Sequence, residues 1–499
     1  MDELGKSEAA LVAARRDNLA ALRSRGNDPF AQTRYPVDAT AQELLARYGF
    51  LEVGQNAESE RWYVAGRVMS KRTMGKTIFA DIHDRTGRLQ CYIRKDEVGD
   101  GAFADWEDLD RGDLVGVHGY LFRSKKGDLT LHVVTFAVLG KALMPLPDKW
   151  HGLQDVEKRY RQRYVDLIVN PEVRDVMILR SRIIAETRRF IDAQGFYEVE
   201  TPTLLHVAGG ASARPFLTNV NALSGEEMQL RIATELNLKR LIVGGMERVY
   251  EIGRIFRNEG IDTTHNPEFT MLELYAAYWD VHDMMDFNEA LIAHLAGVVS
   301  GGGTDLQIGE RTISFARPFA RIGYLEGIEK YSDGKFTRER LLDPKGVAAI
   351  LEELGLPKSP THGHALDKIF ERVLEPHLIQ PTFVTDYPVI ISPLAKRKAG
   401  DPDFVDRYEL FANNMEISNA FTELNDPDDQ RSRFEAQVEE RAKGDEEIPE
   451  PDWDFVRALE YGMPPTAGIG IGMDRLVMLL TNNISIRDVL LFPLQRQHG

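Results

Sequence analysis

The sequence contains a single cysteine, Cys91, among its 499 residues. One thiol excludes an intrachain disulfide framework and a cysteine-rich zinc site, which is typical of a protein in a reducing compartment. Long apolar runs are missing as well, because stretches such as 476–480 (LVMLL) are far shorter than the ~20 residues that cross a bilayer. The start, MDELGKSEAA, is acidic and lacks an apolar core. We therefore expect no signal peptide, no membrane contact and a cytoplasmic location.

Positive charge is scarce relative to negative charge. The chain has 61 lysines and arginines against 78 aspartates and glutamates, a formal net charge of −17. This balance argues against a general attraction of the surface to nucleic acid. It does not exclude a local basic groove, because phosphate contacts act at short range under salt screening. The length is sufficient for two or three domains and a large buried core.

Two familiar nucleotide motifs are absent from the glycine-rich stretch GIGIGMDR, residues 468–475. The third glycine of a dinucleotide fingerprint would fall on Met473, and a phosphate loop would need Gly-Lys-Ser/Thr. What remains is a strand with one bare face, followed directly by Arg475 and an apolar helix. A flat ligand could lie on that face beneath the arginine. Close packing of the helix against the strand explains the glycines equally well.

The first part of the chain predicts a small all-β domain behind two helices. Apolar periodicity and terminal glycines indicate helices over 8–25 and 39–48. Five short strands follow between 62 and 140, with a helical segment, 102–109, between the third and the fourth. This order indicates an OB barrel, a fold that often binds single-stranded nucleic acid, although a purely structural barrel has the same pattern.

The remainder predicts a large α+β domain. A long helix over 171–194 begins at Pro171 after Asn170, and an antiparallel pair covers 248–259 and 268–279. A strand-rich block starts at 404, and the stretch 296–392 looks like a separate insertion rich in helix formers. We expect an N-terminal helical extension (1–60), a barrel (61–145), a linker (146–170) and the large domain (171–499).

Residues of the antiparallel pair predict a binding pocket. In 269–275 (FTMLELY), strand alternation places Phe269, Met271, Glu273 and Tyr275 on one face. An aromatic ring, a carboxylate and a phenol on one face suit a pocket for a flat ring and a cation. Upstream, Arg257 stands at a strand end beside a loop, as a phosphate clamp would. An ordinary surface arginine is the alternative.

The block 404–424 predicts a hairpin that carries two carboxylates. If Asn413 and Asn414 form a two-residue turn, Phe411 faces Glu416 and Glu409 faces Ser418. Glu409 and Glu416 then become diagonal neighbours that repel each other unless a divalent cation lies between them. Oxygen ligands alone favour Mg²⁺. A half-solvated acidic hairpin without a metal is the alternative.

The other polar residues of this hairpin bear on its geometry. In regular pairing, Asn419, Phe421 and Glu423 alternate on the face opposite to the two carboxylates. A site that needs all five side chains therefore predicts a β-bulge near Ser418.

Three segments together resemble the class II aminoacyl-tRNA synthetases. Motif 1 (about 180–203) includes Pro202 after the long helix, motif 2 (about 248–279) includes Arg257-Asn258-Glu259, and motif 3 (about 466–482) includes the glycines before Arg475. The barrel is similar to that of the aspartyl, asparaginyl and lysyl subgroup. Longer stretches are most similar to the bacterial lysyl-tRNA synthetases: MGKTIFADIHD, PLPDKWHGLQDVEKRYRQRYVDL, GGASARPF, FRNEG, HNPEFTMLELY, FTELNDPDDQ and EYGMPPTAGIGIGMDRL.

The resemblance implies a fold and an ATP site. The fold is α+β, a class II antiparallel sheet flanked by helices and preceded by an all-β OB-fold barrel. Arg257 and Arg475 act as the catalytic cations: Arg257 grips the α-phosphate, and Arg475 covers the adenine that lies on Phe269 and reaches the γ-phosphate. The implied ATP site comprises Arg257, Glu259, His265, Phe269, Glu409, Gly472 and Arg475. Glu409 and Glu416 are the implied ligands of Mg²⁺, with up to three ions near the phosphates.

The resemblance also implies an amino acid pocket. It maps to Gly210, Glu235, Glu273, Tyr275, Asn419, Phe421 and Glu423. Three carboxylates suit lysine, whose two ammonium groups can each be paired, whereas aspartyl enzymes present cations to their substrate. Tyr275 can add a hydrogen bond at the ε end.

In the barrel, the resemblance implies contacts to the anticodon. Phe79 resembles the aromatic residue that stacks on a base, and Arg72, Gln90 and Asp128 match neighbouring contacts. Asp128 stands where relatives often carry glutamate, which shortens its reach. Thr264 replaces an arginine of some relatives, which puts one outer-phosphate contact in doubt.

The implied activity is that of a lysine–tRNA ligase with ATP, L-lysine and tRNA(Lys) as partners. Lysine attacks the α-phosphate of ATP to give lysyl-adenylate and pyrophosphate, and the tRNA 3′ hydroxyl then takes the lysine. A homodimer is implied too, since the long helix has more apolar residues than one buried face of a surface helix needs (Val173, Val176, Met177, Ile184).

Three other functions compete with that of a lysine–tRNA ligase. An aspartyl or asparaginyl synthetase is the runner-up, which the three glutamates disfavour. A paralogue that modifies a translation factor lacks the barrel. A non-catalytic regulator usually loses motif arginines or metal ligands, which are present here.

Overall fold

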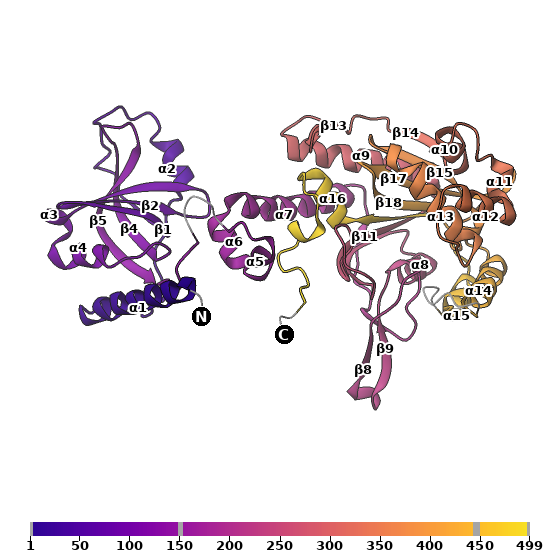
Figure 1. Cartoon of the computed structure of the whole chain (residues 1–499), viewed down its shortest axis with the longest axis horizontal. Helices are drawn as coiled ribbons and strands as arrows, with labels where there is room; N and C mark the ends of the chain where they lie inside the picture. The colour runs from indigo at the N-terminus through magenta and orange to yellow at the C-terminus, as the bar shows by residue number, and fades with distance from the viewer. Residues whose placement is uncertain (1–2, 148–152, 443–449, 497–499) are drawn as a thin grey trace. The chain divides into compact units, whose positions relative to one another are not determined.

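The chain forms two compact units, Met1–Gln154 and Asp155–Gly499, in a computed structural model that describes residues 3–147, 153–442 and 450–496 (Figure 1). Part of the expected linker 146–170, residues 148–152, lies outside these ranges. Within them, no helix combines the length and the apolar character needed to cross a membrane.

The first unit is a closed five-stranded barrel behind two helices, as the sequence predicted. The barrel order is β1-β2-β3-β5-β4. Its elements are α1 (Glu3–Ser24), α2 (Ala41–Arg47), β1 (Trp62–Met74), β2 (Thr77–His83), β3 (Arg88–Arg94), α3 (Lys95–Val98), α4 (Asp100–Glu107), β4 (Leu114–Arg123) and β5 (Leu129–Gly140). The helical segment between the third and the fourth strand is confirmed.

Side-chain alternation accounts for the barrel. Ile78, Ala80 and Ile82 of β2 are buried inside, while the residues between them remain partly exposed. Trp106 of α4 is fully buried in the same core. Because the inward residues fill the barrel, its outer face is free to carry polar and aromatic contacts.

A mostly antiparallel sheet organises the second unit. Its order is β14-β15-β17-β18-β19-β11-β10-β6, and β16 pairs with β17. The strands are β6 (Tyr197–Glu198), β10 (Arg248–Phe256), β11 (Glu268–Ala277), β14 (Ala320–Gly323), β15 (Thr382–Pro388), β16 (Arg397–Lys398), β17 (Asp401–Ala412), β18 (Met415–Thr422) and β19 (Thr466–Gly472). Only the β6–β10 and β14–β15 pairs are parallel. The predicted α+β class with an antiparallel sheet is thereby confirmed.

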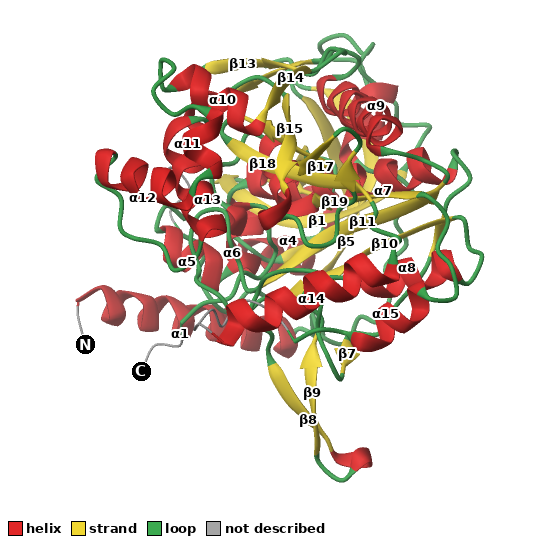
Figure 2. Ribbon diagram, turned by 90° about the vertical axis from the view of Figure 1, so that its right-hand side faces the viewer, coloured by secondary structure: helices red, strands yellow, loops and turns green. Residues whose placement is uncertain are grey.

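Helices cover this sheet. The main core packs α7 (Pro171–Asp192), α9 (Val281–Ser300) and α16 (Met473–Leu480) on the central strands. A smaller cluster joins α8 (Glu235–Val243), α14 (Pro427–Ala442) and α15 (Trp453–Leu459), and α14 and α15 lie side by side (Figure 2). The remaining short elements are α5 (Val156–Arg161), α6 (Arg163–Val169), η1 (Asn221–Leu223), η2 (Glu375–His377), η3 (Val389–Ile391) and η4 (Ile486–Asp488).

A hairpin projects from the second unit. It consists of β8 (Leu217–Val220) and β9 (Glu226–Leu230), which form a three-stranded sheet with β7 (Leu204–Leu205). Figure 1 shows the hairpin extending away from the large sheet. Leu217 on the hairpin and Leu223 at its tip are exposed.

The stretch 296–392 is only partly a separate body. Its helices α10 (Tyr324–Tyr331), α11 (Arg338–Leu342), α12 (Pro344–Glu353) and α13 (His362–Val373) form their own core. Its beginning belongs to α9, which continues to Ser300 before Gly301 adopts a left-handed conformation, and β14 and β15 are strands of the large sheet. Residues between α9 and β14 form the hairpin β12 (Asp305–Ile308) and β13 (Arg311–Ser314).

The apolar residues of α7 do not support the argument made for a partner subunit. Val173 and Met177 are buried within the chain, and Val176 and Ile184 pack against its main core. Their number is explained by contacts inside one subunit, so this reason for a homodimer was wrong. Ile178 is the large apolar residue of α7 that is exposed.

Candidate active site

A cavity of about 480 Å³ opens on one face of the large sheet. Its walls come mainly from β11, β18, β19, the starts of α8 and α16, and the loop after β10. Most residues proposed from the sequence line it: Gly210, Glu235, Arg257, Glu259, His265, Phe269, Glu273, Tyr275, Glu416, Asn419, Phe421, Gly472 and Arg475. Glu409 and Glu423 lie behind this lining, each in contact with a residue that belongs to it.

The glycines of β19 make room for neighbouring side chains. A Cβ atom on Gly468 would lie 2.2 Å from Oε1 of Glu423 and 2.3 Å from Cε1 of Tyr275. A Cβ on Gly470 would lie 2.5 Å from Cε of Met271. At these two positions the space that the glycines leave is filled by the protein itself, so close packing explains them rather than a bare floor for a ligand.

At the phosphate-clamp position, Arg257 follows directly on the end of β10. Its Nε donates to the carbonyl of Ile232 at 3.3 Å, and its guanidinium lies 5.2 Å from the centre of the Phe269 ring. Burial lowers the pKa of Arg257, which Glu259 and Glu416 oppose. A guanidinium keeps its charge under such a shift because its ordinary pKa is above 12. The cavity therefore has a permanent cation beside an aromatic ring.

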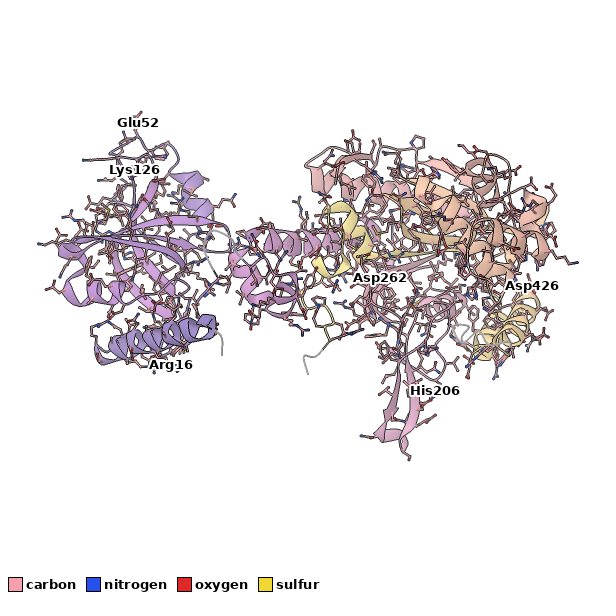
Figure 3. All side chains as sticks on the ribbon, in the orientation of Figure 1. Arg16, Glu52, Lys126, His206, Asp262 and Asp426 are labelled. Atoms are coloured by element: carbon pink, nitrogen blue, oxygen red, sulfur yellow. The ribbon has the colours of Figure 1, made fainter. Side chains whose placement is uncertain are left out.

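The loop between β10 and β11 orients His265. Asp262, labelled in Figure 3, accepts hydrogen bonds from the backbone amides of Thr264 (2.7 Å) and His265 (2.8 Å). Although burial opposes it, these bonds and the imidazole lower the pKa of Asp262 to about 2. Nδ1 of His265 lies 2.8 Å from Asp262, and Nε2 lies 2.9 Å from Nη2 of Arg475. Since arginine can only donate, Nε2 accepts and Nδ1 carries the proton.

Arg475 lies in the first turn of α16 and faces the metal-ligand candidates. Its Nη1 donates to Oε2 of Glu416 at 3.0 Å and to the Glu416 carbonyl at 3.3 Å. Asp474 fixes this turn, because its Oδ2 accepts from the amide of Thr270 at 2.7 Å and its Oδ1 lies 2.5 Å from Nη1 of Arg180. Asp474 and Arg180 were not found from the sequence, since each resembles an ordinary charged helix residue.

The hairpin β17–β18 has the predicted turn and the predicted bulge. Asn413 and Asn414 have φ values of 53° and 60°, as a type I′ turn requires, and Phe411 pairs with Glu416. The register then shifts, so that Leu410 pairs with Ser418 and Glu409 with Asn419. The predicted pairing of Glu409 with Ser418 was wrong because Ile417 is the extra residue of the bulge.

The bulge brings the polar residues to one face. Pairing with Phe411 places Glu416 on the face of Glu409, and pairing with Glu409 places Asn419 there too. Ser418 points to the opposite side, where its hydroxyl accepts from Nδ2 of Asn288 at 2.7 Å in the core. The inserted residue thus places Glu409, Glu416 and Asn419 on the same face of the hairpin.

Glu409 and Glu416 share one face of the hairpin and could contribute two carboxylates to a cation site. Burial raises the pKa of Glu409 to about 7, with Arg407 lowering it and the charge of Glu416 raising it. Glu409 accepts from Tyr387 Oη at 2.7 Å and from Arg407 Nη2 at 2.6 Å. Among the described residues, no group of three or more His, Cys, Asp or Glu could hold a metal. Two carboxylates with phosphate oxygens are a common arrangement for Mg²⁺.

One end of the cavity is acidic and buried. Glu273 Oε1 accepts from the amide of Thr234 at 3.0 Å, and Oε2 accepts from Tyr275 Oη at 3.4 Å. Burial raises the pKa of Glu273 to about 7, and the charge of Glu235 adds to this effect. Oε1 of Glu423 is buried without a hydrogen-bond partner in the described part of the chain. A buried acceptor without a donor in the protein leaves room for a donor from a bound ligand or a water molecule.

Lys239 is a buried cation that the sequence analysis missed. It lies on α8, with Nζ 2.6 Å from Oε1 of Glu235 and in an ion pair with Oε2 of Glu423. Its side chain is 0% exposed. The spacing Glu235-x-x-x-Lys239 could have indicated a helical ion pair, but such pairs are usually solvated and carry little information.

Asn266 is a second residue of the cavity that was missed. Its Nδ2 donates to the carbonyl of Glu268 at 2.6 Å, whereas its Oδ1 is buried without a partner among the described residues. Asn266 lines the cavity between His265 and Phe269. Its position in that loop was the only sequence signal.

In the barrel, three of the four anticodon candidates share the outer face. Arg72 pairs with Phe79 across β1 and β2, with its guanidinium 5.9 Å from the ring centre. Tyr92, which was not predicted, lies across from Phe79 at 4.9 Å between ring centres, and Gln90 is two residues away on the same face of β3. Asp128 directly precedes β5 and is exposed.

Comparison with known proteins defines the class. Residues 155–496 match the family described as tRNA synthetases class II (D, K and N), and residues 62–139 match the OB-fold nucleic acid binding domain. The chain therefore belongs to the class II tRNA synthetases of the D, K and N group.

The names of similar proteins narrow the class to one amino acid. The chain is 51% identical to the lysine–tRNA ligase of Halalkalibacterium halodurans over 498 residues, which cover 99% of this chain and 98% of the relative. It is 51% identical to the lysine–tRNA ligase of Moorella thermoacetica, over 98% of this chain and 99% of the relative. The lysine–tRNA ligase of Bacillus subtilis is also 51% identical, over 97% and 96% respectively.

Proposed function

We propose that the chain is a lysine–tRNA ligase, which activates L-lysine with ATP and transfers it to the 3′ end of tRNA(Lys). The observation that carries this proposal is the buried acidic pocket formed by Glu235, Glu273 and Glu423. Glutamates in such a pocket attract a substrate with two ammonium groups and repel the side-chain carboxylate of aspartate. Relatives of nearly full length carry the same name.

In this reaction the pocket orients lysine. We assign the ε-ammonium to Oε1 of Glu423, with Tyr275 and Glu273 beside it, and the α-ammonium to Glu235 nearer the cavity mouth. The α-carboxylate then faces Arg257, which neutralises both this nucleophile and the α-phosphate. Catalysis on this account is mostly positioning, because the chain supplies cations and fixed hydrogen bonds and no nucleophile of its own.

ATP occupies the other half of the cavity. Phe269 supports the adenine, and Arg475 and His265 face the outer phosphates. Glu409 and Glu416 would hold Mg²⁺, whose charge would offset that of the phosphates during attack. The backbone amide of Thr264 donates to Asp262 and helps to fix the conformation of this loop. The side chain of Thr264 stands where some relatives have an arginine.

A pH dependence follows from the raised pKa of Glu273. Lysine binding needs the ionised carboxylate, and the pKa of Glu273 is about 7. The apparent KM for lysine should therefore fall as the pH rises from about 6 to about 8 and level off above, because the charged form dominates there. Initial rates of pyrophosphate exchange measure it. A KM for lysine that stays constant over this range, or rises with pH, contradicts the role of Glu273.

Removal of the metal-ligand candidates should weaken Mg²⁺ dependence. We expect Glu409→Gln and Glu416→Gln each to lower pyrophosphate exchange about 10²-fold at saturating lysine. The Mg²⁺ concentration for half-maximal rate should rise in both variants. If the double variant keeps the full rate and an unchanged Mg²⁺ requirement, the two glutamates hold no catalytic metal.

The barrel should contribute to tRNA charging and not to lysine activation. Stacking of a base on an aromatic side chain is worth about 1–3 kcal/mol. Phe79→Ala is therefore expected to lower kcat/KM for aminoacylation about 10- to 100-fold, with pyrophosphate exchange unchanged. Phe30→Ala, at an exposed aromatic outside the barrel strands, is the matched control. An equal effect of the two substitutions on charging would contradict an anticodon contact.

We further infer a homodimer through the second unit. Exposed apolar side chains on α7, β6 and β8 support it, namely Ile178, Tyr197 and Leu217. Light scattering at micromolar protein should give twice the mass of one chain, and a stable monomer that is fully active would exclude the dimer as a requirement.

The proposal is tested by charging with purified tRNA. The protein should transfer lysine to tRNA(Lys), with AMP formed, and should leave tRNA(Asp) and tRNA(Asn) uncharged by their amino acids. Charging of tRNA(Asp) with aspartate, or of tRNA(Asn) with asparagine, would instead favour an aspartyl or asparaginyl synthetase.

A further inference from the structure

Lys239 places a positive charge inside the pocket that is proposed to receive a positively charged substrate. Its ammonium lies between two of the three pocket carboxylates, 2.6 Å from Glu235 and in contact with Glu423. Two aromatic rings close the space around it, Phe421 at 5.4 Å and Phe455 at 5.7 Å from Nζ. The side chains of Lys239 and Glu423 are both 0% exposed, so water does not screen this pair.

The surroundings of Lys239 favour its charged form. Burial alone would lower the pKa of Lys239, but Glu235 and Glu423 raise it above its ordinary value. Burial and the neighbouring carboxyls hold the pKa of Glu423 well above its ordinary value, and the charge of Lys239 acts against this rise and favours the ionised form. Without the ammonium, two buried carboxylates would face each other, and at least one would take up a proton at neutral pH.

We infer that Lys239 is a built-in counter-ion that keeps Glu235 and Glu423 ionised and so makes the pocket selective for a dicationic amino acid. When all three carboxyls are ionised, they and the one ammonium carry a net charge of −2, which the two ammonium groups of lysine would cancel. Lys239 acts through the glutamates and is a positioning residue for their charge. This inference rests on the proposed lysine specificity and deepens it.

The charged groups that face Lys239 are few. Besides the two glutamates, β11 contributes Glu273 and Tyr275, which hydrogen-bond to each other. The packed helix α15 presents Phe455, and Asp452 directly before it is bound by Arg240 at 2.8 Å. Arg240 also lies 3.1 Å from Asp454, so the charge of this arginine is engaged at α15.

Selectivity should depend on this internal charge. With the glutamates ionised, a ligand that lacks the ε-ammonium leaves a buried carboxylate unpaired, which is strongly unfavourable. With one carboxyl protonated, a neutral hydroxyl at the same place can donate and accept instead. Loss of Lys239 should thus weaken the binding of lysine and strengthen the binding of its neutral isostere.

The experiment compares L-lysine with L-6-hydroxynorleucine, which has a hydroxyl in place of the ε-ammonium. In pyrophosphate exchange, the wild-type ratio of kcat/KM should be about 10⁴, and Lys239→Met should reduce it to about 10² or less. In Lys239→Met, the ratio should recover as the pH rises from about 7.5 to about 9, because the carboxyls ionise, while the wild-type ratio stays constant. Lys239→Arg, which keeps the charge, should retain more of the ratio than Lys239→Met.

Two variants keep the test decisive. Lys239→Gln removes the charge with a polar side chain and should lower the ratio as Lys239→Met does, even if the latter unfolds at a lower temperature. Arg431→Met removes an exposed charge of α14 that pairs with Glu460 and should leave the ratio unchanged. An equal loss for both substrates in the Lys239 variants, with the ratio and its pH profile as in the wild type, would overturn the inference and leave the lysine assignment intact. A wild type that does not prefer lysine would instead overturn the proposed function.

Discussion

Replacement of Arg257 by alanine is expected to lower lysine-dependent pyrophosphate exchange about 10³-fold, mainly through kcat. The guanidinium sits at the end of β10, beside Phe269 and within the field of Glu259 and Glu416. On our account it neutralises charge on the α-phosphate as the lysine carboxylate attacks. Arg257→Lys should recover little of the rate, because an ammonium cannot reproduce the planar pair of donors.

A neighbouring arginine provides the control. Arg254 lies on β10, three residues before Arg257, and forms an exposed ion pair with Glu268 at 3.4 Å. Exposed pairs contribute little, so Arg254→Ala should leave exchange unchanged. If Arg257→Ala kept most of its activity, or if both substitutions had similar effects, the phosphate role of Arg257 would be wrong.

Glu423→Gln is expected to have an effect of similar size on the amino acid side. The substitution keeps the shape of the side chain and removes the charge that the ε-ammonium would meet. Sites built to bind one polar group reject a mismatch by about 10⁴-fold, and we expect kcat/KM for lysine to fall about 10³-fold because Glu273 remains nearby. The KM for ATP should not change, since we propose that the two substrates occupy different halves of the cavity.

The result must be separated from a loss of folding. Glu423 pairs with buried Lys239, so thermal unfolding of Glu423→Gln has to be measured beside its kinetics. Glu460→Gln, at an exposed glutamate that pairs with Arg431, is the control and should behave as the wild type. A change in the KM for ATP equal to that for lysine would point to general disruption of the cavity.

The barrel and the hairpin were predictable from the sequence because local rules determine them. Alternation of apolar residues defined the five strands, and two consecutive asparagines defined a turn that needs positive φ at both positions. The bulge was accessible only through a functional argument, that Glu409, Glu416 and Asn419 should share one face. No local property of Ile417 distinguishes it as the extra residue.

Buried charge was the main feature that the sequence did not reveal. Lys239 and Asp474 lie in helices where their spacing resembles that of solvated residues, and only packing shows that both are buried. The glycines of β19 illustrate the same limit. Their number predicted close approach, but whether a ligand or Tyr275 and Glu423 fill the space depends on strands that are distant in the chain.

The central claim is that this chain activates lysine, and amino-acid-dependent ATP–pyrophosphate exchange tests it most directly. The purified protein should be assayed with each of the standard amino acids, without tRNA. We predict exchange with lysine at a kcat/KM about 10³-fold or more above that of any other amino acid, because two ammonium groups at the spacing of lysine would pair both proposed cation positions of the pocket. Exchange with aspartate or asparagine in the absence of exchange with lysine would contradict the account.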